Sequence, residues 1–119
     1  MTTSERRINR RIPAKYEISY IHDGDYLISF SKDISIDGMF VHTDKVLPVG
    51  NLTELTFSIG ELEQITVKAK VVWVNDSANT ADYGMGIKFV EPPSALKETI
   101  LKILNRVAVI EDMKISGNS

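Results

Sequence analysis

The spacing of apolar residues changes once along this chain, at Pro92-Pro93, and this change limits the possible folds more than any other sequence feature. Before the prolines, apolar side chains recur at every second position, most regularly from Ile65 to Trp73, which is typical of half-buried strands. After them the spacing becomes helical, with Ser94 as a candidate N-cap. The apolar helix positions are Leu96, Ile100, Ile103, Leu104 and Val107. The sequence therefore predicts a mainly β domain that ends in one helix.

Turn residues divide the part before the prolines into short strands. Asp23-Gly24 separates two alternating runs and predicts a hairpin. We expect strands over residues 14–21, 26–36, 39–41, 52–59, 65–73 and 83–90. In the run from Tyr26, the residues Ile28, Phe30, Ile34 and Ile36 keep one phase. This pattern favours a small six-stranded antiparallel β-barrel with the helix packed on it. We assign residues 1–13 to a flexible basic arm, 14–110 to the barrel and helix, and 111–119 to a frayed tail.

The composition excludes several classes of protein. A chain of 119 residues has the length of one domain, and 43% hydrophobic with 25% charged residues is ordinary for a globular protein. The absence of Cys rules out disulfides and thiolate chemistry and fits a reducing cytoplasm. No apolar run reaches the roughly 18 residues of a membrane span. We therefore expect a cytoplasmic protein without membrane insertion.

Charge is distributed unevenly along the chain. The first fifteen residues carry +4 although the whole chain carries −2, so the remainder carries −6. Their basic residues are Arg6, Arg7, Arg10, Arg11 and Lys15. A basic arm on an acidic body indicates an anionic partner for the arm. It argues against a nucleic-acid partner, which requires basic residues spread over one face.

The arginines form two pairs spaced by four residues, Arg6/Arg10 and Arg7/Arg11, and so create an R-x-x-x-R motif. A guanidinium is a planar fork of donors that fits phosphate oxygens two at a time. The same plane can stack on a guanine face. The alternative is a solvated basic tail without a specific ligand.

A second motif, D-x-S-x-x-G, is formed by Asp33, Ser35 and Gly38. A carboxylate accepts hydrogen bonds from guanine N1 and N2, and a serine hydroxyl can donate or accept at a base edge or phosphate. We expect Gly38 to adopt a backbone conformation that a Cβ would strain. A ligand with both phosphates and guanines would need both motifs. Taken alone, the second motif is better explained as an ordinary strand connection.

In this order, the two motifs resemble those of the PilZ domain, the bacterial receptor module for cyclic di-GMP. The resemblance covers residues 5–107 and includes three further segments. They are Arg11-Ile12-Pro13, Val71-Val72-Trp73-Val74 and Gly84-Met85-Gly86-Ile87-Lys88-Phe89. The resemblance implies a PilZ-like barrel and favours Arg7 and Arg11 as the motif arginines. Asp37 departs from the small residue that many members have there.

Three other residues allow two interpretations each. Gly84 and Gly86 either let the ligand approach the barrel closely or mark a bulge. Trp73 falls in the apolar phase of its strand, so we expect it in the core rather than against a ligand. The candidate ligand-binding residues are therefore Arg6, Arg7, Arg10, Arg11, Asp33, Ser35, Gly38 and Gly86.

The resemblance implies a cytoplasmic receptor or adaptor for cyclic di-GMP that regulates an effector protein in motility, pili, biofilm or exopolysaccharide output. Ligand binding would order the arm and change the surface shown to that effector. The guanidinium count favours a stacked pair of ligands, whose four phosphate charges balance the arm. The alternative is a PilZ-like interaction module without ligand binding. We expect no enzyme, cofactor or metal, because P-loop and nucleophile-elbow motifs are absent and His22 and His42 lack ligand spacing.

Overall fold

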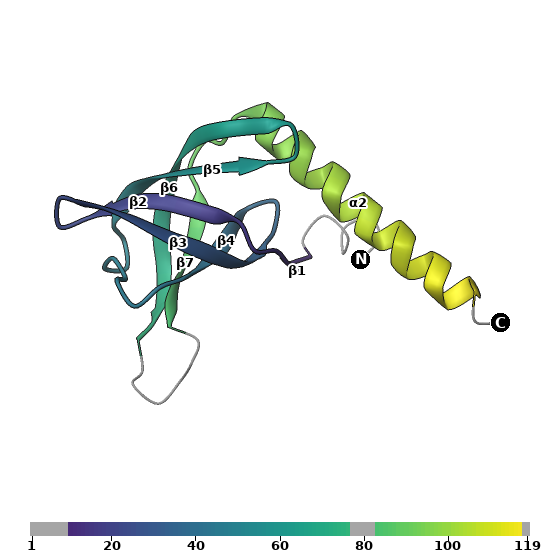
Figure 1. Cartoon of the computed structure of the whole chain (residues 1–119), viewed down its shortest axis with the longest axis horizontal. Coiled ribbons are helices and arrows are strands. Elements are labelled where there is room, and N and C mark those ends of the chain that lie inside the picture. The colour runs from purple at the N-terminus through teal and green to yellow at the C-terminus, as the bar shows by residue number, and fades with distance from the viewer. Residues whose placement is uncertain (1–9, 77–82, 118–119) are drawn as a thin grey trace.

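The computed structural model describes residues 10–76 and 83–117. Within these residues an antiparallel sheet is followed by one helix, α2 (Figure 1). The elements are β1 (Ile12–Pro13), β2 (Glu17–His22), β3 (Asp25–Ile34), β4 (Gly38–His42), β5 (Leu52–Ile59), β6 (Leu62–Asn75), β7 (Gly84–Phe89) and α2 (Ser94–Gly117).

Six strands close into a barrel. Neighbouring strands follow the order β3-β2-β5-β6-β7-β4, and β4 pairs back onto β3. The predicted six-stranded antiparallel barrel with a C-terminal helix is therefore confirmed. The short strand β1 adds to β3 through the pairs Ile12↔Ile34 and Pro13↔Asp33. It was not predicted, because two residues are too few for a periodic pattern.

Alternating side chains fill the barrel interior. On β6, Val67 and Val71 are buried while Lys68 is exposed, as the period of two requires. Helix α2 packs on the barrel with one apolar face, and its buried residues include Leu96, Ile100 and Leu104. This helical spacing agrees with the sequence analysis.

Helix α2 continues past residue 110, where the predicted helix ends, and reaches Gly117. Its C-terminal half extends beyond the barrel (Figure 1). No helix within residues 10–76 and 83–117 is both long and apolar enough to cross a membrane. The flexibility of residues 1–13 and 111–119 stays a prediction.

A β-bulge in β3 reverses the phase of that strand. Ser31 pairs with Val41 and Asp33 with Phe40, so Lys32 is an extra residue on the β3 side. Phe30 is consequently exposed whereas Ile34 is fully buried. The prediction that both lie on one face is wrong, because a bulge inserts a residue that period-two reasoning does not include.

A second bulge has the same effect on β6. Val71 pairs with Ile87 and Trp73 with Gly86, which leaves Val72 as the extra residue. Trp73 is therefore turned outward and is 50% exposed. The prediction of a core Trp73 is wrong for the same physical reason, since bulges re-aim the side chains that follow them.

Candidate functional site

The D-x-S-x-x-G motif forms the connection between β3 and β4. Asp33 lies near the end of β3, and the backbone N–H of Ser35 donates to the Gly38 carbonyl at 2.8 Å to close the turn. A Cβ on Gly38 would lie 1.9 Å from the Ile87 carbonyl oxygen on β7. Gly38 is not among the glycines with positive φ. The close approach of β7 therefore excludes any side chain at position 38, and the prediction of a strained backbone there is wrong.

Arg11 brings the two sequence motifs together. Its Nε and Nη2 donate to Asp33 Oδ1 at 2.9 and 2.6 Å, and its Nη1 donates to Ser35 Oγ at 3.3 Å. The pairing of β1 with β3 places Arg11 beside these residues, which follow it by 22 and 24 positions. The side chain assigned to phosphate and the side chains assigned to guanine thus bind one another. Ser35 is buried beneath this contact, whereas the Arg11 and Asp33 side chains keep 47% and 27% exposure.

Arg10 points to a different part of the molecule. Its Nη1 donates to Glu111 Oε2 at 2.8 Å, and its Nη2 donates to Glu111 Oε1, so helix α2 holds it in a bidentate ion pair. The hydrogen bond to Glu111, followed by its negative charge, raises the pKa of Arg10 above the ordinary value. The guanidinium of Arg10, like that of every arginine, is charged at physiological pH. The other two candidate arginines, Arg6 and Arg7, lie outside the described residues.

Gly86 lies opposite the β6 bulge and beneath an aromatic side chain. A Cβ on Gly86 would lie 2.1 Å from Trp73 Nε1. The indole therefore covers the position at which a ligand would have to approach Gly86. Gly84, two residues earlier, is covered in the same way by Phe40, whose ring atoms would lie within 2.6 Å of a Cβ there.

A small pocket of about 190 Å³ adjoins the Arg11 contact. Its lining is Lys32, Asp33, Phe40, Trp73 and Asn75. Apart from Asp33, the sequence analysis proposed none of these as ligand-binding residues. They come from β3, β4 and β6, and periodicity within one strand carries no information about such cross-strand neighbours.

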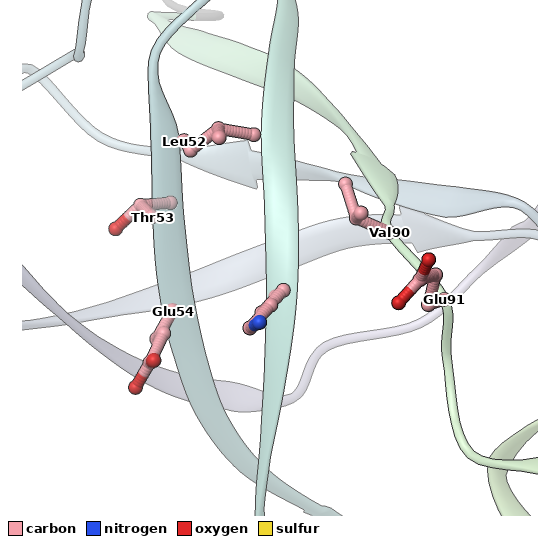
Figure 2. Close-up of a pocket in the computed structure, with 6 residues that line it drawn as sticks. Leu52, Thr53, Glu54, Val90 and Glu91 are labelled. Atoms are coloured by element: carbon pink, nitrogen blue, oxygen red, sulfur yellow. The ribbon is translucent and has the colours of Figure 1, made fainter.

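A larger hollow of about 370 Å³ shares no residue with this site. Figure 2 shows Leu52, Thr53 and Glu54 on one side of it and Val90 and Glu91 on the other. Lys68 completes the lining. With two carboxylates against one ammonium, this hollow disfavours an anionic ligand.

The side chains around Arg11 are suited to binding. They provide a guanidinium fork for phosphate, a carboxylate and a hydroxyl for a base edge, and an exposed aromatic ring for stacking. Within the described parts of the chain, no cluster of His, Asp and Glu side chains is arranged to hold a metal ion.

Solved structures of similar fold support this description. The Bacillus subtilis inhibitor of motility, MotI/DgrA, has a TM-score of 0.71 at 17% identity over 83% of this chain and 49% of its own. The PilZ domain of Escherichia coli YcgR with c-di-GMP has a TM-score of 0.62 at 15% identity over 92% and 96%. Escherichia coli YcgR in complex with c-di-GMP has a TM-score of 0.66 at 15% identity over 92% and 49%. The present chain thus spans about half of the first and third of these proteins.

The sequence comparisons are equally clear. No curated protein matches the chain. The PilZ domain family, by contrast, matches residues 5–106, which is most of the 119-residue sequence and includes every candidate ligand-binding residue. The chain belongs to the PilZ domain family.

Proposed function

We propose that this chain is a receptor for cyclic di-GMP. The observation that supports this proposal most directly is the hydrogen bonding of Arg11 to both Asp33 and Ser35. A phosphate-binding fork and a guanine-binding carboxylate thereby occupy one patch of surface, as a ligand with both groups requires. Structures of similar fold that contain c-di-GMP add support from outside the chain.

In the proposed mechanism, a phosphate of the dinucleotide replaces Asp33 as the partner of Arg11. Both Arg11 bonds to the carboxylate end on Oδ1, so Oδ2 accepts neither of them. The Arg11–Asp33 pair is partly exposed to solvent, and such pairs are worth about 0–1 kcal/mol. A charge-assisted bond to phosphate contributes about 1.5–3 kcal/mol. Loss of the Arg11–Asp33 pair therefore costs little, and the exchange releases Asp33 to accept from guanine N1 and N2. Arg7 would be the second phosphate ligand.

The output of the receptor would come from the arm and helix α2. Arg10 immediately precedes Arg11, the proposed phosphate ligand, in the sequence. Its ion pair with Glu111 joins the arm to helix α2. A ligand that moves Arg11 would also strain or break this ion pair and change the surface that α2 presents. We propose an effector protein in motility, pili, biofilm or exopolysaccharide output as its target, in the cytoplasm.

A second candidate function is an interaction module that binds no nucleotide. Three apolar side chains on the outer surface of the β2–β3 hairpin, Ile21, Tyr26 and Ile28, are 57%, 65% and 62% exposed. Tyr26 pairs directly with Ile21 across the two strands, so these residues form one patch. Exposed apolar patches often mark protein contacts.

Isothermal titration calorimetry with cyclic di-GMP decides between the two functions. We expect saturable binding to the wild type and at least tenfold weaker binding to Arg11→Ala, which loses one charge-assisted contact. Arg106→Ala is the matched control, because it removes an exposed arginine of helix α2 from outside the motif. Absence of binding by the wild type, with no heat at two temperatures, would select the interaction module. Equal binding by Arg11→Ala and the wild type would show that the site assignment is wrong.

A further inference from the structure

We propose that Ser31 is a positioning residue for ligand binding, because its buried hydroxyl fixes the register in which β1 pairs with β3. That register decides which arginine faces the D-x-S-x-x-G motif. This inference rests on the proposed function and adds to it a residue that lies outside both sequence motifs. Ser31 is only 3% exposed, so it acts through the neighbouring backbone and not by touching a ligand.

The segment from β1 to β2 pairs with β3 in two different registers. In β2, Glu17 pairs with Phe30. Continued back along the chain without interruption, this register would pair Pro13 with Ile34. In β1, however, the partner of Ile34 is Ile12. The N-terminal segment therefore contains one residue more than the stretch of β3 that lies opposite it.

The Ser31 hydroxyl lies at the point where the register changes. Its Oγ accepts a hydrogen bond from the Tyr16 N–H at 2.8 Å and donates one to the Ala14 carbonyl. The Ser31 N–H donates to the Tyr16 carbonyl at 2.9 Å, and the Ala14 N–H donates to the Lys32 carbonyl at 3.1 Å. Lys15, between the two bonded residues, is exposed. One side chain thus bonds to two backbone groups on either side of the extra residue.

The register determines the side to which each arginine points. Residues paired directly across antiparallel strands project from the same face, and a shift of one residue moves a side chain to the other face. Ile34 is fully buried, and its partner Ile12 likewise points inward and is 4% exposed. Arg11, one residue earlier, is therefore directed outward, where it donates to Asp33 and Ser35.

The register of β2, if it continued into β1, would exchange the two arginines. Pro13 would then point inward, and so would Arg11. Arg10 would take the outward position, although in the structure it binds Glu111 on helix α2. The register that Ser31 supports is thus the one that directs Arg11 to the motif and Arg10 to the helix.

Loss of the Ser31 hydroxyl should detach β1 from the barrel. Burial of an unpaired guanidinium is costly, so β1 would leave β3 rather than turn Arg11 inward. The Tyr16 N–H and the Ala14 carbonyl would each lose a partner, which costs stability where such groups are shielded from water. Since β1 has only two paired residues, little else retains it. A receptor whose binding-competent form is only partly populated binds with an affinity lowered by that fraction.

NMR spectroscopy of the ligand-free protein tests the register directly. In the wild type we expect an Overhauser contact between Pro13 and Asp33, which pair across the strands, and slow hydrogen exchange of the Tyr16 amide. Ser31→Ala should weaken the contact and accelerate the exchange about tenfold or more. Ser31→Cys, whose thiol donates and accepts only weakly, gives the same comparison if Ser31→Ala does not fold. A Pro13–Asp33 contact and a Tyr16 exchange rate that do not change would overturn the inference.

Calorimetry with cyclic di-GMP measures the consequence for binding. We expect Ser31→Ala to bind about three- to tenfold more weakly than the wild type. Thr43→Val is the matched control, because it also removes a buried hydroxyl, one that hydrogen-bonds with the Tyr20 hydroxyl and the Lys45 N–H. Thr43 follows the end of β4 that lies away from the motif. This variant should lose stability in urea and bind as the wild type does.

The outcomes separate this inference from the proposed function. Saturable binding by the wild type with equal affinity in Ser31→Ala would overturn the positioning role and leave the receptor intact. Equal weakening in Ser31→Ala and Thr43→Val would indicate general destabilisation and would also overturn it. Absence of binding by the wild type would overturn the proposed function and the positioning role together, whereas the NMR comparison would still decide whether Ser31 sets the register.

Discussion

Arg10 and Glu111 lie 101 residues apart in the sequence, and the guanidinium of Arg10 donates to both carboxylate oxygens of Glu111. The next residue, Arg11, donates to Asp33 on the barrel. Two consecutive arginines, Arg10 and Arg11, therefore connect helix α2 with the barrel. Any ligand that binds Arg10 or Arg11 has to compete with a carboxylate of the protein, that of Glu111 or Asp33.

Glu111→Gln should raise the affinity for cyclic di-GMP measurably, by about two- to threefold. The substitution removes the negative charge that retains Arg10, while the side chain keeps its size. The gain is small because exposed ion pairs contribute little and are screened by salt. Calorimetry at low and at high salt would measure the difference, which should shrink as salt rises.

Glu98→Gln is the control for that experiment, since it removes an exposed carboxylate from the first half of the same helix. We expect it to bind as the wild type does. Weaker or unchanged binding by Glu111→Gln would mean that Arg10 stays on the helix when the ligand binds. The proposed link between ligand and helix surface would then be wrong.

Asp33→Ala should reduce the preference for cyclic di-GMP over cyclic di-AMP. A carboxylate can accept from N1 and N2 of guanine, and adenine lacks both donors. Competition titrations with the two dinucleotides give the ratio of dissociation constants, which should fall toward one. Asp25→Ala, at the opposite end of β3, should leave the ratio unchanged. If Asp33→Ala loses affinity with the same preference, Asp33 only positions Arg11.

Alanine substitutions at Gly38 and Gly86 should lower the free energy of unfolding by different amounts. At Gly38 the new Cβ meets backbone, 1.9 Å from the Ile87 oxygen, so β4 and β7 must separate. We expect destabilisation at or above the top of the about 1–3 kcal/mol range for overpacking. At Gly86 the Cβ meets the Trp73 side chain, which is half exposed and can turn away at lower cost.

Urea denaturation of both variants checks this order, and it would be contradicted if Gly86→Ala were the less stable protein. The emission of Trp73 offers a second measurement. In Gly86→Ala it should shift to longer wavelength as the indole moves into water. In Gly38→Ala, if folded, it should shift less.

The sequence was sufficient to predict the barrel and the helix but not the surface that surrounds the motifs. Alternation identified β6 correctly because burial in a half-exposed strand follows a period of two. The same rule placed Trp73 in the core, because the extra residue Val72 reverses the inward–outward alternation of β6. The alternation of residue types in the sequence does not reveal such an insertion. The motifs predicted that Arg11 and Asp33 belong to one site, yet their contact with each other depends on the pairing of β1 with β3. The partner of Arg10 lies on a helix at the other end of the chain, where no local pattern could indicate it.

The stoichiometry of binding is the last prediction, and we expect two cyclic di-GMP molecules per chain. The arm carries four arginines, and Arg6 and Arg10 exceed the two that one R-x-x-x-R motif needs. A stacked pair of ligands has four phosphate charges and would balance the cluster, whereas one ligand has two. Glu111 retains Arg10 in the structure, so the second molecule should bind more weakly than the first. Calorimetry of Arg6→Ala should therefore give one ligand per chain, with Lys15→Ala as the basic control. One ligand per wild-type chain, unchanged by Arg6→Ala, would rule out the stacked pair.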